Sequence, residues 1–338
     1  MGVEFFHPDL YNCIIMRRTR KKESFFSKTF NFLLTLSIAC LIGNQVIGAQ
    51  GYSLKFAQIS DAHTATGYPN TSYKLLENSK ELLADAVLQA NKEENLDFVI
   101  FSGDMIDRPN SSQLMEFISI VKNLKTPWWV AIGNHDVDFD GKFTKKDLYR
   151  IINAHNLHFN SDKPYYTFSP KKGFKVIVLD STITSRVTAN GEIPTEQLDW
   201  LDKEIRDTSD KDVVIICSHA PAIEPFQSEH HEILNKNEVL KHVYSYNRPI
   251  IWIAGHYHGT KVIQDGNKLF INSPALITYP NAFRILNINS QKDKVLVDIY
   301  TKETTLKDIQ RRAKIRTLFA DMLYGEEKDR NGTYELSK

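Results

Sequence analysis

The stretch FVIFSGDMIDR, residues 98–108, sets the pattern that decides the fold of this chain. Its first four residues are apolar and β-prone, which is typical of a strand buried on both faces of a sheet. Gly103 lets the backbone turn sharply where the strand ends, and Asp104 then projects a carboxylate from that end. The stretch therefore predicts a ligand-binding loop at the carboxyl edge of an α/β sheet.

The same strand-then-loop pattern recurs from residue 54 onward. Short apolar runs predict strands at 54–59, 98–101, 128–132, 175–179, 213–217 and 250–254. Amphipathic stretches predict helices at 75–93, 112–123, 144–154, 195–206 and 238–246. This alternation predicts an α/β fold in which helices cover a sheet. Between 261 and 300, shorter runs separated by turns predict hairpins that finish a second sheet.

One domain is expected over residues 52–303, because no repeat or low-complexity linker divides this region. Residues 304–338 are expected to form a helix, at 305–324, and a loose charged tail. The helix has apolar residues at helical spacing on one face and basic residues opposite, so we expect it to pack on the domain. Binding of a membrane surface or a partner by its basic face stays open.

Composition limits the classes of protein that this chain can represent. The chain has 338 residues, of which 42% are hydrophobic and 25% charged, so it can bury a sizeable core. Its 42 basic residues balance 41 acidic ones. This charge implies no nucleic-acid partner, because sequence-independent binding of nucleic acid needs a basic field.

Residues 1–50 have the three parts of a secretory signal. Basic residues precede an uncharged run at 32–43, and small and polar residues follow it. Twelve residues are few for a bilayer span of roughly 20, so we expect an exported, periplasmic or extracellular protein with a cleaved signal. An uncleaved membrane anchor stays open, as does lipid modification of Cys40. A start at Met16 would place the basic residues directly at the N-terminus.

Cysteine usage gives no disulfide framework for the expected domain. Removal of residues 1–49 leaves Cys217 as the one remaining cysteine of the sequence. A single thiol forms no internal disulfide, so the domain must be held by its core, which suits a reducing or an oxidising compartment.

Five clusters of potential ligands follow predicted strands. They are Asp61-Ala-His63, Gly103-Asp-Met-Ile-Asp-Arg108, Gly133-Asn-His-Asp136, Ser218-His219 and Gly255-His-Tyr-His258. Taken singly, each is explained by a helix cap, a turn glycine or a core histidine. Together they predict one shared site, because five strand ends each deliver an oxygen or nitrogen ligand in a domain with few strands.

The residue types in these clusters suit a pair of divalent cations. Two cations roughly 3.5 to 4 Å apart repel each other, so a carboxylate must bridge them. Asp104 lies centrally among the clusters in sequence and is the expected bridge. Mixed imidazole and carboxylate ligands suit Mn, Fe, Zn or Co. No cluster contains a cysteine, which argues against a structural zinc site.

In this order, the motifs D-x-H, G-D-x-x-D-R, G-N-H-D, a strand-end H and G-H-x-H resemble those of the calcineurin-like metallophosphoesterases. Residues 193–201 and 272–275 resemble segments of its cyclic-nucleotide phosphodiesterase (class III)-like branch. The resemblance implies a two-sheet β-sandwich flanked by helices. It also implies a dinuclear-metal-dependent hydrolase in which metal-bound hydroxide attacks a phosphodiester or phosphomonoester in line. The expected substrate is a small-molecule phosphate ester.

The resemblance also assigns site residues. It implies that one metal is held by Asp61, His63, Asp104 and His258. It implies that the other is held by Asp104, Asn134, His219 and His256. Two departures from the family pattern, Ser218 and Pro109, stand where many relatives have glycine, and both touch loops that shape the substrate pocket.

Three further residues take catalytic or binding roles by resemblance. His135 is left without a metal and would protonate the leaving-group oxygen or steady the transition state. Asp107 would orient His135, and Arg108 would contact a phosphate oxygen. A catalytically inactive scaffold of the same fold, used for protein binding, is the alternative from another functional class. Such scaffolds lose metal ligands, and this sequence lacks none of them.

Overall fold

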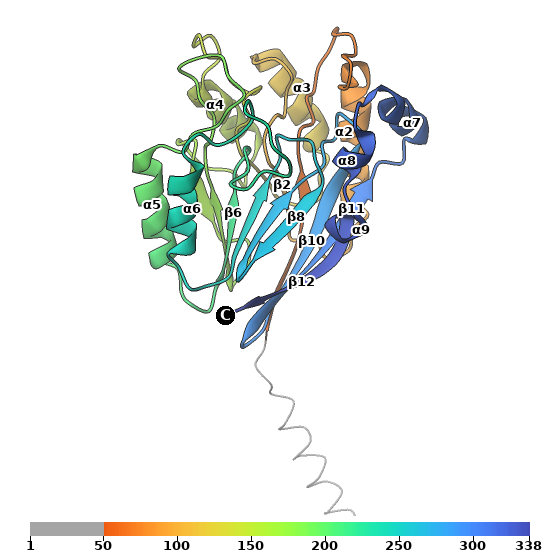
Figure 1. Cartoon of the computed structure of the whole chain (residues 1–338). Helices are drawn as coiled ribbons and strands as arrows, with labels where there is room; N and C mark the ends of the chain where they lie inside the picture. Colours follow the sequence, from red (N-terminus) through yellow and green to blue (C-terminus); the bar gives the residue numbers. More distant parts are fainter. Residues whose placement is uncertain (1–50) are drawn as a thin grey trace, which may run out of the picture. The chain divides into compact units, whose positions relative to one another are not determined.

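Two six-stranded sheets form the centre of the structure, a computed structural model that describes residues 51–338 (Figure 1). The first sheet has the order β12-β11-β10-β1-β2-β3. Its strands are β12 (Asn331–Ser337), β11 (Lys294–Glu303), β10 (Ala282–Ser290), β1 (Tyr52–Ile59), β2 (Phe98–Phe101) and β3 (Trp128–Val130). The predictions for residues 1–50, including the signal, the anchor, Met16 and Cys40, lie outside the described residues.

The second sheet has the order β4-β5-β6-β7-β9-β8. Its strands are β4 (Tyr166–Phe168), β5 (Phe174–Val178), β6 (Val213–Cys217), β7 (Ile250–Ala254), β9 (Lys268–Asn272) and β8 (Lys261–Asp265). The expected hairpins are present, but only β8–β9 finishes the second sheet. The β10–β11 hairpin instead joins the first sheet, because β10 pairs antiparallel with β1 along seven residue pairs.

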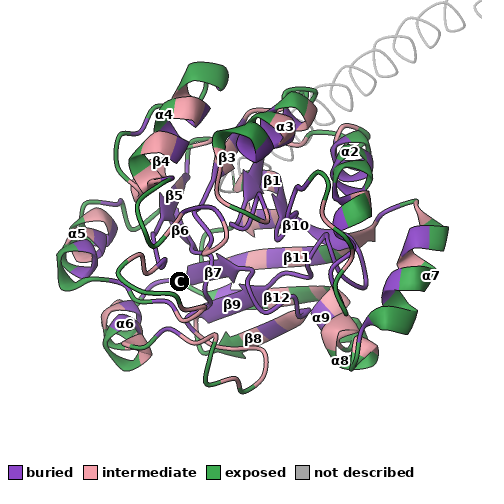
Figure 2. Cartoon of the chain, turned by 90° about the horizontal axis from the view of Figure 1, so that it is seen from above, coloured by how far each residue is buried: buried purple, intermediate pink, exposed green. Residues whose placement is uncertain are grey.

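Helices cover the outer faces of both sheets (Figure 2). One apolar cluster lies between the two sheets, and one lies between each sheet and its helices. The helices over the first sheet are α2 (Ser79–Ala90), α3 (Ser111–Val121) and α4 (Lys145–His155), and those over the second are α5 (Thr195–Arg206) and α6 (Lys236–Tyr244). The 3-10 turn η1 (Leu76–Asn78) precedes α2. This arrangement confirms the expected α/β class and the two-sheet sandwich flanked by helices.

Local sequence signals explain where several of these elements begin. The Asn110 side chain accepts the Gln113 N–H and starts α3. Thr144 and Asp147 form a reciprocal capping box that starts α4. The strands β2, β6 and β7 are buried at every position, as their continuous apolar runs predict. Within residues 51–338, no helix is long and apolar enough to cross a membrane.

The C-terminal segment differs from the expected single helix and loose tail. The helix is broken into α7 (Lys307–Arg316) and α8 (Ala320–Tyr324), with Phe319 between them at a φ of 60°. Ile309 and Ala313 pack in the apolar cluster between the first sheet and its helices, whereas Leu318 and Met322 are exposed. The expected loose tail is wrong, because α9 (Glu327–Arg330) and β12 order it, and β12 pairs with β11.

Candidate metal centre

Five loops bring the predicted ligands to one edge of the two sheets. β1, β2 and β3 run parallel, as do β6 and β7, so the carboxyl ends of each set open on one edge. A pocket of about 350 Å³ lies at these ends. Six predicted site residues line it: His63, Asp104, Asn134, His135, His256 and His258. The remaining predicted ligands, Asp61 and His219, are buried and contact this group.

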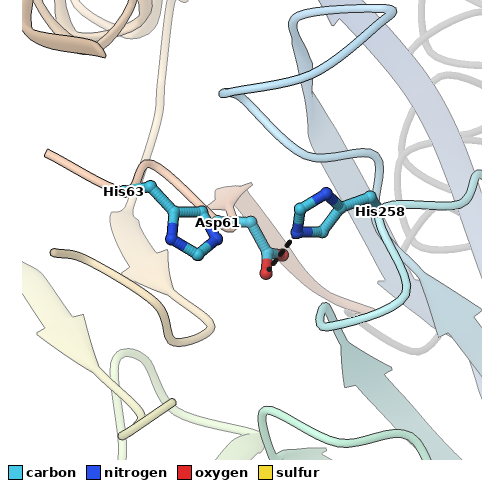
Figure 3. Close-up of side chains that lie close together, drawn as sticks. All are labelled: Asp61, His63 and His258. Carbon is cyan, nitrogen blue, oxygen red and sulfur yellow. Dashed lines mark ion pairs between the residues drawn. The ribbon is translucent and has the colours of Figure 1, made fainter. Parts of the chain in front are cut away.

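Asp61, His63 and His258 form a first group of ligands (Figure 3). One oxygen or nitrogen atom from each residue lies within 4.8 Å of the others. The Asp61 Oδ1 atom is 3.3 Å from His258 Nε2. Atoms that each bind one cation at roughly 2.0 to 2.2 Å are about as far from one another as the ligand atoms of this group are. The group therefore fits a single ion.

Asp104, His219 and His256 form a second group of ligands. The His219 Nε2 atom is 3.4 Å from Asp104 Oδ2 and 3.1 Å from His256 Nδ1. The same Asp104 oxygen is 3.4 Å from Nε2 of His63, in the first group. Asp104 therefore lies between the two groups, and its role as the carboxylate that bridges two ions stays a prediction.

Buried nitrogen and oxygen atoms of several predicted ligands lack a hydrogen-bond partner within the part of the chain that the structure describes. His63 Nε2, His256 Nε2 and Asn134 Oδ1 are buried and make no hydrogen bond to the described residues. A buried polar atom without a partner costs about 1 to 3 kcal/mol. Because these atoms are types that coordinate divalent metals, the donor set fits the metals that the sequence predicts.

The backbone is strained at most of the predicted ligand positions. Asp61, His63, Asp104, His256 and His258 all have positive φ, between 42° and 71°. A non-glycine residue in this region costs on the order of 1 to 3 kcal/mol and persists only where the surroundings enforce it. Such strain gathers at functional sites, and here it turns each side chain out of its strand toward the shared centre.

Two glycines allow the loops to approach one another closely. A Cβ atom at Gly133 would lie 2.1 Å from Asp104 Oδ1, and one at Gly255 would lie 1.8 Å from Ser60 Oγ. Asp136 supports the same loops, because its carboxylate accepts the N–H groups of Gly133 and Ile106. Burial, together with the nearby Asp104 charge, raises the pKa of Asp136 to about 8. Asp136 therefore shapes the site without contributing to either ligand group.

The sequence model of the calcineurin-like phosphoesterases matches residues 54–260, which include all seven predicted ligands. The chain belongs to this family. It is therefore a metal-dependent phosphoric ester hydrolase by descent, as its site geometry suggests.

Curated relatives of this phosphoesterase act on different phosphate esters. The manganese-dependent ADP-ribose/CDP-alcohol diphosphatase of Arabidopsis thaliana is 26% identical over an alignment of 250 positions that covers 61% of this chain and 77% of that protein. A probable cyclic nucleotide phosphodiesterase of Fibrobacter succinogenes is 26% identical over an alignment of 235 positions that covers 66% of this chain and 79% of that one. A dimetal phosphatase from Danio rerio shares the fold, with a TM-score of 0.58 at 20% identity over 75% of this chain and 99% of its own.

The two histidines that face Asp104 in this phosphoesterase carry opposite pKa shifts. Burial, helped by the Lys74 ammonium, lowers the pKa of His63 to about 3. Burial also opposes charge on His219, but the Asp104 carboxylate outweighs it and raises the pKa of His219 to about 9. Burial alone would raise the pKa of Asp104, yet the surrounding histidines hold it well below its usual range.

His135 lies at the pocket wall, outside both ligand groups. Its side chain is 35% exposed, and its Nδ1 atom donates to the Asp107 carbonyl oxygen at 2.8 Å. Because a carbonyl only accepts, Nδ1 carries a hydrogen and Nε2 faces the pocket. The Asp107 carboxylate is farther away, 3.9 Å from Nδ1, and contacts His63 Nδ1 at 3.2 Å. The contact that orients His135 thus comes from the Asp107 backbone.

Arg108 is not brought into the pocket. Its side chain is exposed, and its guanidinium lies 4.6 Å from the centre of the Tyr68 ring. A contact with bound phosphate would require the guanidinium to leave this ring.

Lys74 is a pocket residue that the sequence analysis missed. Its side chain is 7% exposed, lines the pocket and reaches both His63 and His135. No sequence motif marks it, because it precedes η1 in a loop and its partners are distant in sequence. The sequence offers one signal for Lys74, which is that this basic residue follows closely after the first ligand cluster, Asp61-Ala-His63.

Proposed function

We propose that this phosphoesterase uses two divalent metal ions to hydrolyse a phosphodiester or phosphomonoester of a small molecule. The observation that carries the proposal is the position of Asp104, 3.4 Å from one histidine of each ligand group. A single carboxylate shared by two groups of nitrogen and oxygen ligands is what a pair of repelling cations requires. The complete ligand set also argues against the scaffold alternative.

The proposed ligands divide as the two groups do. Asp61, His63 and His258 would hold one ion, and Asn134, His219 and His256 the other, with Asp104 common to both. When bound, the ions would activate a water molecule as nucleophile and draw charge from the phosphoryl oxygens. The donor set suits Mn, Fe, Zn or Co, and the Arabidopsis relative is named manganese-dependent.

His135 would deliver a proton to the leaving group. Its Nε2 atom faces the pocket, because Nδ1 is held by the Asp107 carbonyl. That orientation lets Nε2 protonate the oxygen on which the broken P–O bond leaves its electron pair. Asp107 would position the ring, and Arg108 would contact phosphate only after leaving Tyr68.

The pocket wall supports an ester with a flat group. Tyr73, Phe226, His231 and Tyr257 line the pocket beside the ligand groups. Aromatic side chains bury flat rings by stacking, and relatives are named for ADP-ribose, CDP-alcohol and cyclic nucleotide substrates. We therefore infer that the ester carries a nucleoside or a similar planar group.

Export remains part of the proposal for residues 1–50, by cleavage of a signal or by retention of an anchor. The support is the order of basic, uncharged and small residues in that segment. N-terminal sequencing of the protein recovered from a cell envelope fraction would test it, and an intact cytoplasmic chain would contradict it.

The proposed function is tested by replacing His135 with asparagine. We expect His135→Asn to retain both metals and to lose about 10²–10⁴-fold in kcat, the usual contribution of a general acid. Metal content and turnover of diphenyl phosphate and phenyl phosphate, whose phenolate leaving groups need a proton, would be measured with added Mn. The matched control is His155→Asn, at an exposed position of α4, which should leave turnover unchanged. Full activity in His135→Asn would remove the assigned role, and wild-type protein without metal-dependent turnover would contradict the function.

A further inference from the structure

Lys74 is held rigidly at the edge of the pocket. Its backbone N–H donates to Thr71 Oγ1 at 2.9 Å, and its carbonyl accepts the Thr71 N–H at 3.0 Å. The next residue, Leu75, donates its N–H to the Ile277 carbonyl oxygen at 3.1 Å. Only 7% of the Lys74 side chain is exposed. The protein therefore fixes the backbone of Lys74 and encloses its side chain, so the ammonium group is held at the pocket edge and not in bulk solvent.

The Lys74 ammonium has three contacts, all of them with residues of the site. Nζ is 3.2 Å from His63 Nδ1, 3.3 Å from Asp107 Oδ1 and 3.3 Å from His135 Nε2. All three distances are longer than those of charge-assisted hydrogen bonds, which are usually about 2.7 to 2.9 Å long. The one carboxylate that Lys74 contacts, Asp107, is also shared with His63.

Lys268 shows what a structural buried lysine looks like in the same chain. Its ammonium donates to the carbonyl oxygens of Tyr246 and Arg248 at 2.8 and 2.9 Å, and to Asn267 Oδ1 at 2.5 Å. All three of its donors are satisfied by short bonds. Lys74 has only long contacts, two of them to imidazole rings, and it faces a pocket. Because these contacts are long, an incoming anion can replace them and take the N–H donors of Lys74.

The positive charge of Lys74 becomes favourable when an anionic substrate occupies the pocket. A buried ammonium next to a proposed pair of cations raises electrostatic repulsion unless anionic oxygens enter the pocket. Its position beside His135 Nε2 places it next to the atom from which the leaving group would take a proton. A fixed positive charge at that point stabilises negative charge as it develops there.

We propose that Lys74 is a further catalytic residue that contacts the leaving-group oxygen of the phosphate ester. As a water oxygen bonds to phosphorus and gives up a proton to solvent, from which His135 later recovers one, the P–O bond to the leaving group breaks and its electron pair passes to the leaving-group oxygen. The Lys74 ammonium turns from His135 Nε2 to this oxygen and holds its charge by hydrogen bonding, while His135, then carrying a proton on Nε2, supplies the proton that completes the alcohol. This inference rests on the proposed function, because it assigns a role in the same reaction.

The test compares leaving groups of different basicity on the same phosphoryl group. Methyl p-nitrophenyl phosphate has a good leaving group and methyl phenyl phosphate a poor one. We expect Lys74→Met to lower kcat about 10²-fold for the phenyl ester and about tenfold or less for the nitrophenyl ester, because the better leaving group needs less stabilisation. Lys74→Arg should recover part of the phenyl-ester rate, and metal content should match that of the wild type.

Controls separate this role from a structural one. Lys268→Met should lower stability without changing the ratio of the two rates, and Lys74→Gln provides a second variant should Lys74→Met fail to fold. Equal losses for both esters, or no loss, would overturn the role of Lys74. If wild-type turnover depends on metal and His135→Asn is impaired while Lys74→Met is not, only this inference falls. Wild-type protein without metal-dependent turnover would overturn the proposed function as well.

Discussion

His63 and His219 face the same carboxylate oxygen but differ in what lies behind them. Each Nε2 atom is 3.4 Å from Asp104 Oδ2. Behind His63, Nδ1 meets the Lys74 ammonium and the Asp107 carboxylate, whereas His219 Nδ1 donates to the Ser102 carbonyl at 2.8 Å. The pKa of His63 is lowered to about 3, mainly by burial, and that of His219 is raised to about 9, because Asp104 outweighs burial.

The difference teaches that two ligands of the same residue type are prepared differently for a cation, because the balance of burial and nearby charge differs at each ring. In the metal-free protein at neutral pH, His63 is neutral and ready to coordinate. His219 is protonated at the same pH and must release a proton before it can bind metal. On one side of the site, burial helped by a neighbouring cation keeps His63 neutral. On the other side, the Asp104 carboxylate stabilises the protonated His219 until a metal replaces the proton.

The largest effect is expected from removing what the two histidines share. Asp104→Asn deletes the charge on which both ligand groups depend, so we expect metal content to fall at both groups and kcat to fall at least about 10²–10³-fold. Metal analysis and turnover would measure this, with His63→Gln and His219→Gln as variants that each remove a ligand from one group only. A variant of Asp104 that retained both ions would show that the two groups do not share this carboxylate.

A smaller effect is expected from disturbing only the His219 side. A Cβ atom at Gly103 would lie 2.3 Å from His219 Nδ1, and Gly103 has a φ of 98°. Gly103→Ala should therefore cost about 1 to 3 kcal/mol of stability. It should also weaken metal binding at the His219 group about 10- to 100-fold, because the ring loses its Ser102 partner.

Gly266→Ala is the matched control for this variant. Gly266 also has positive φ, but nothing lies within 4 Å of its Cβ position. We expect Gly266→Ala to lose about 1 to 2 kcal/mol of stability, the cost of holding an alanine at positive φ, and to bind metal normally. Denaturant unfolding and metal titration would compare the two. Equal metal affinity in both variants would show that the His219 ring tolerates the clash.

The smallest effect is expected in the pH dependence of metal binding. Because the pKa of His219 is raised to about 9, a proton competes with metal below that pH. Affinity at this group should rise about tenfold per pH unit between pH 7 and 9 and level off above it. His63, with a pKa lowered to about 3, should add no dependence in this range. Calorimetry in buffers of different ionisation enthalpy should detect about one proton released, and a pH-independent affinity would contradict the difference between the two histidines.

The strand ends were predictable because their signals are local. The runs at 98–101, 213–217 and 250–254 match β2, β6 and β7, and each leads directly into a predicted ligand. Continuous apolar runs encode burial on both faces, and ligand chemistry restricts the residue types that follow them. The expected strand at 128–132 is two residues shorter in the structure, since β3 ends at Val130.

The C-terminal strand β12 was not predictable in the same way. It is an edge strand in which only Leu336 is buried, so its sequence carries little hydrophobic pattern. The strand is held by pairing with β11, and the preceding helix α9 is held by Arg284, whose guanidinium donates to the Asp329 carbonyl oxygen at 2.7 Å. Such pairing is a tertiary property and leaves no local trace.

By itself, the sequence determined the family, the α/β class and which side chains could bind metal, because these depend on residue types at the ends of buried strands. Only the tertiary structure decided that Asp104 lies between the two ligand groups and that His63 and His219 differ in protonation. It alone brought Lys74 to Asp107 and His135, which are 33 and 61 residues away. The physical reason is that charge and burial act through space, so the surroundings of a side chain are set by packing and not by its sequence neighbours.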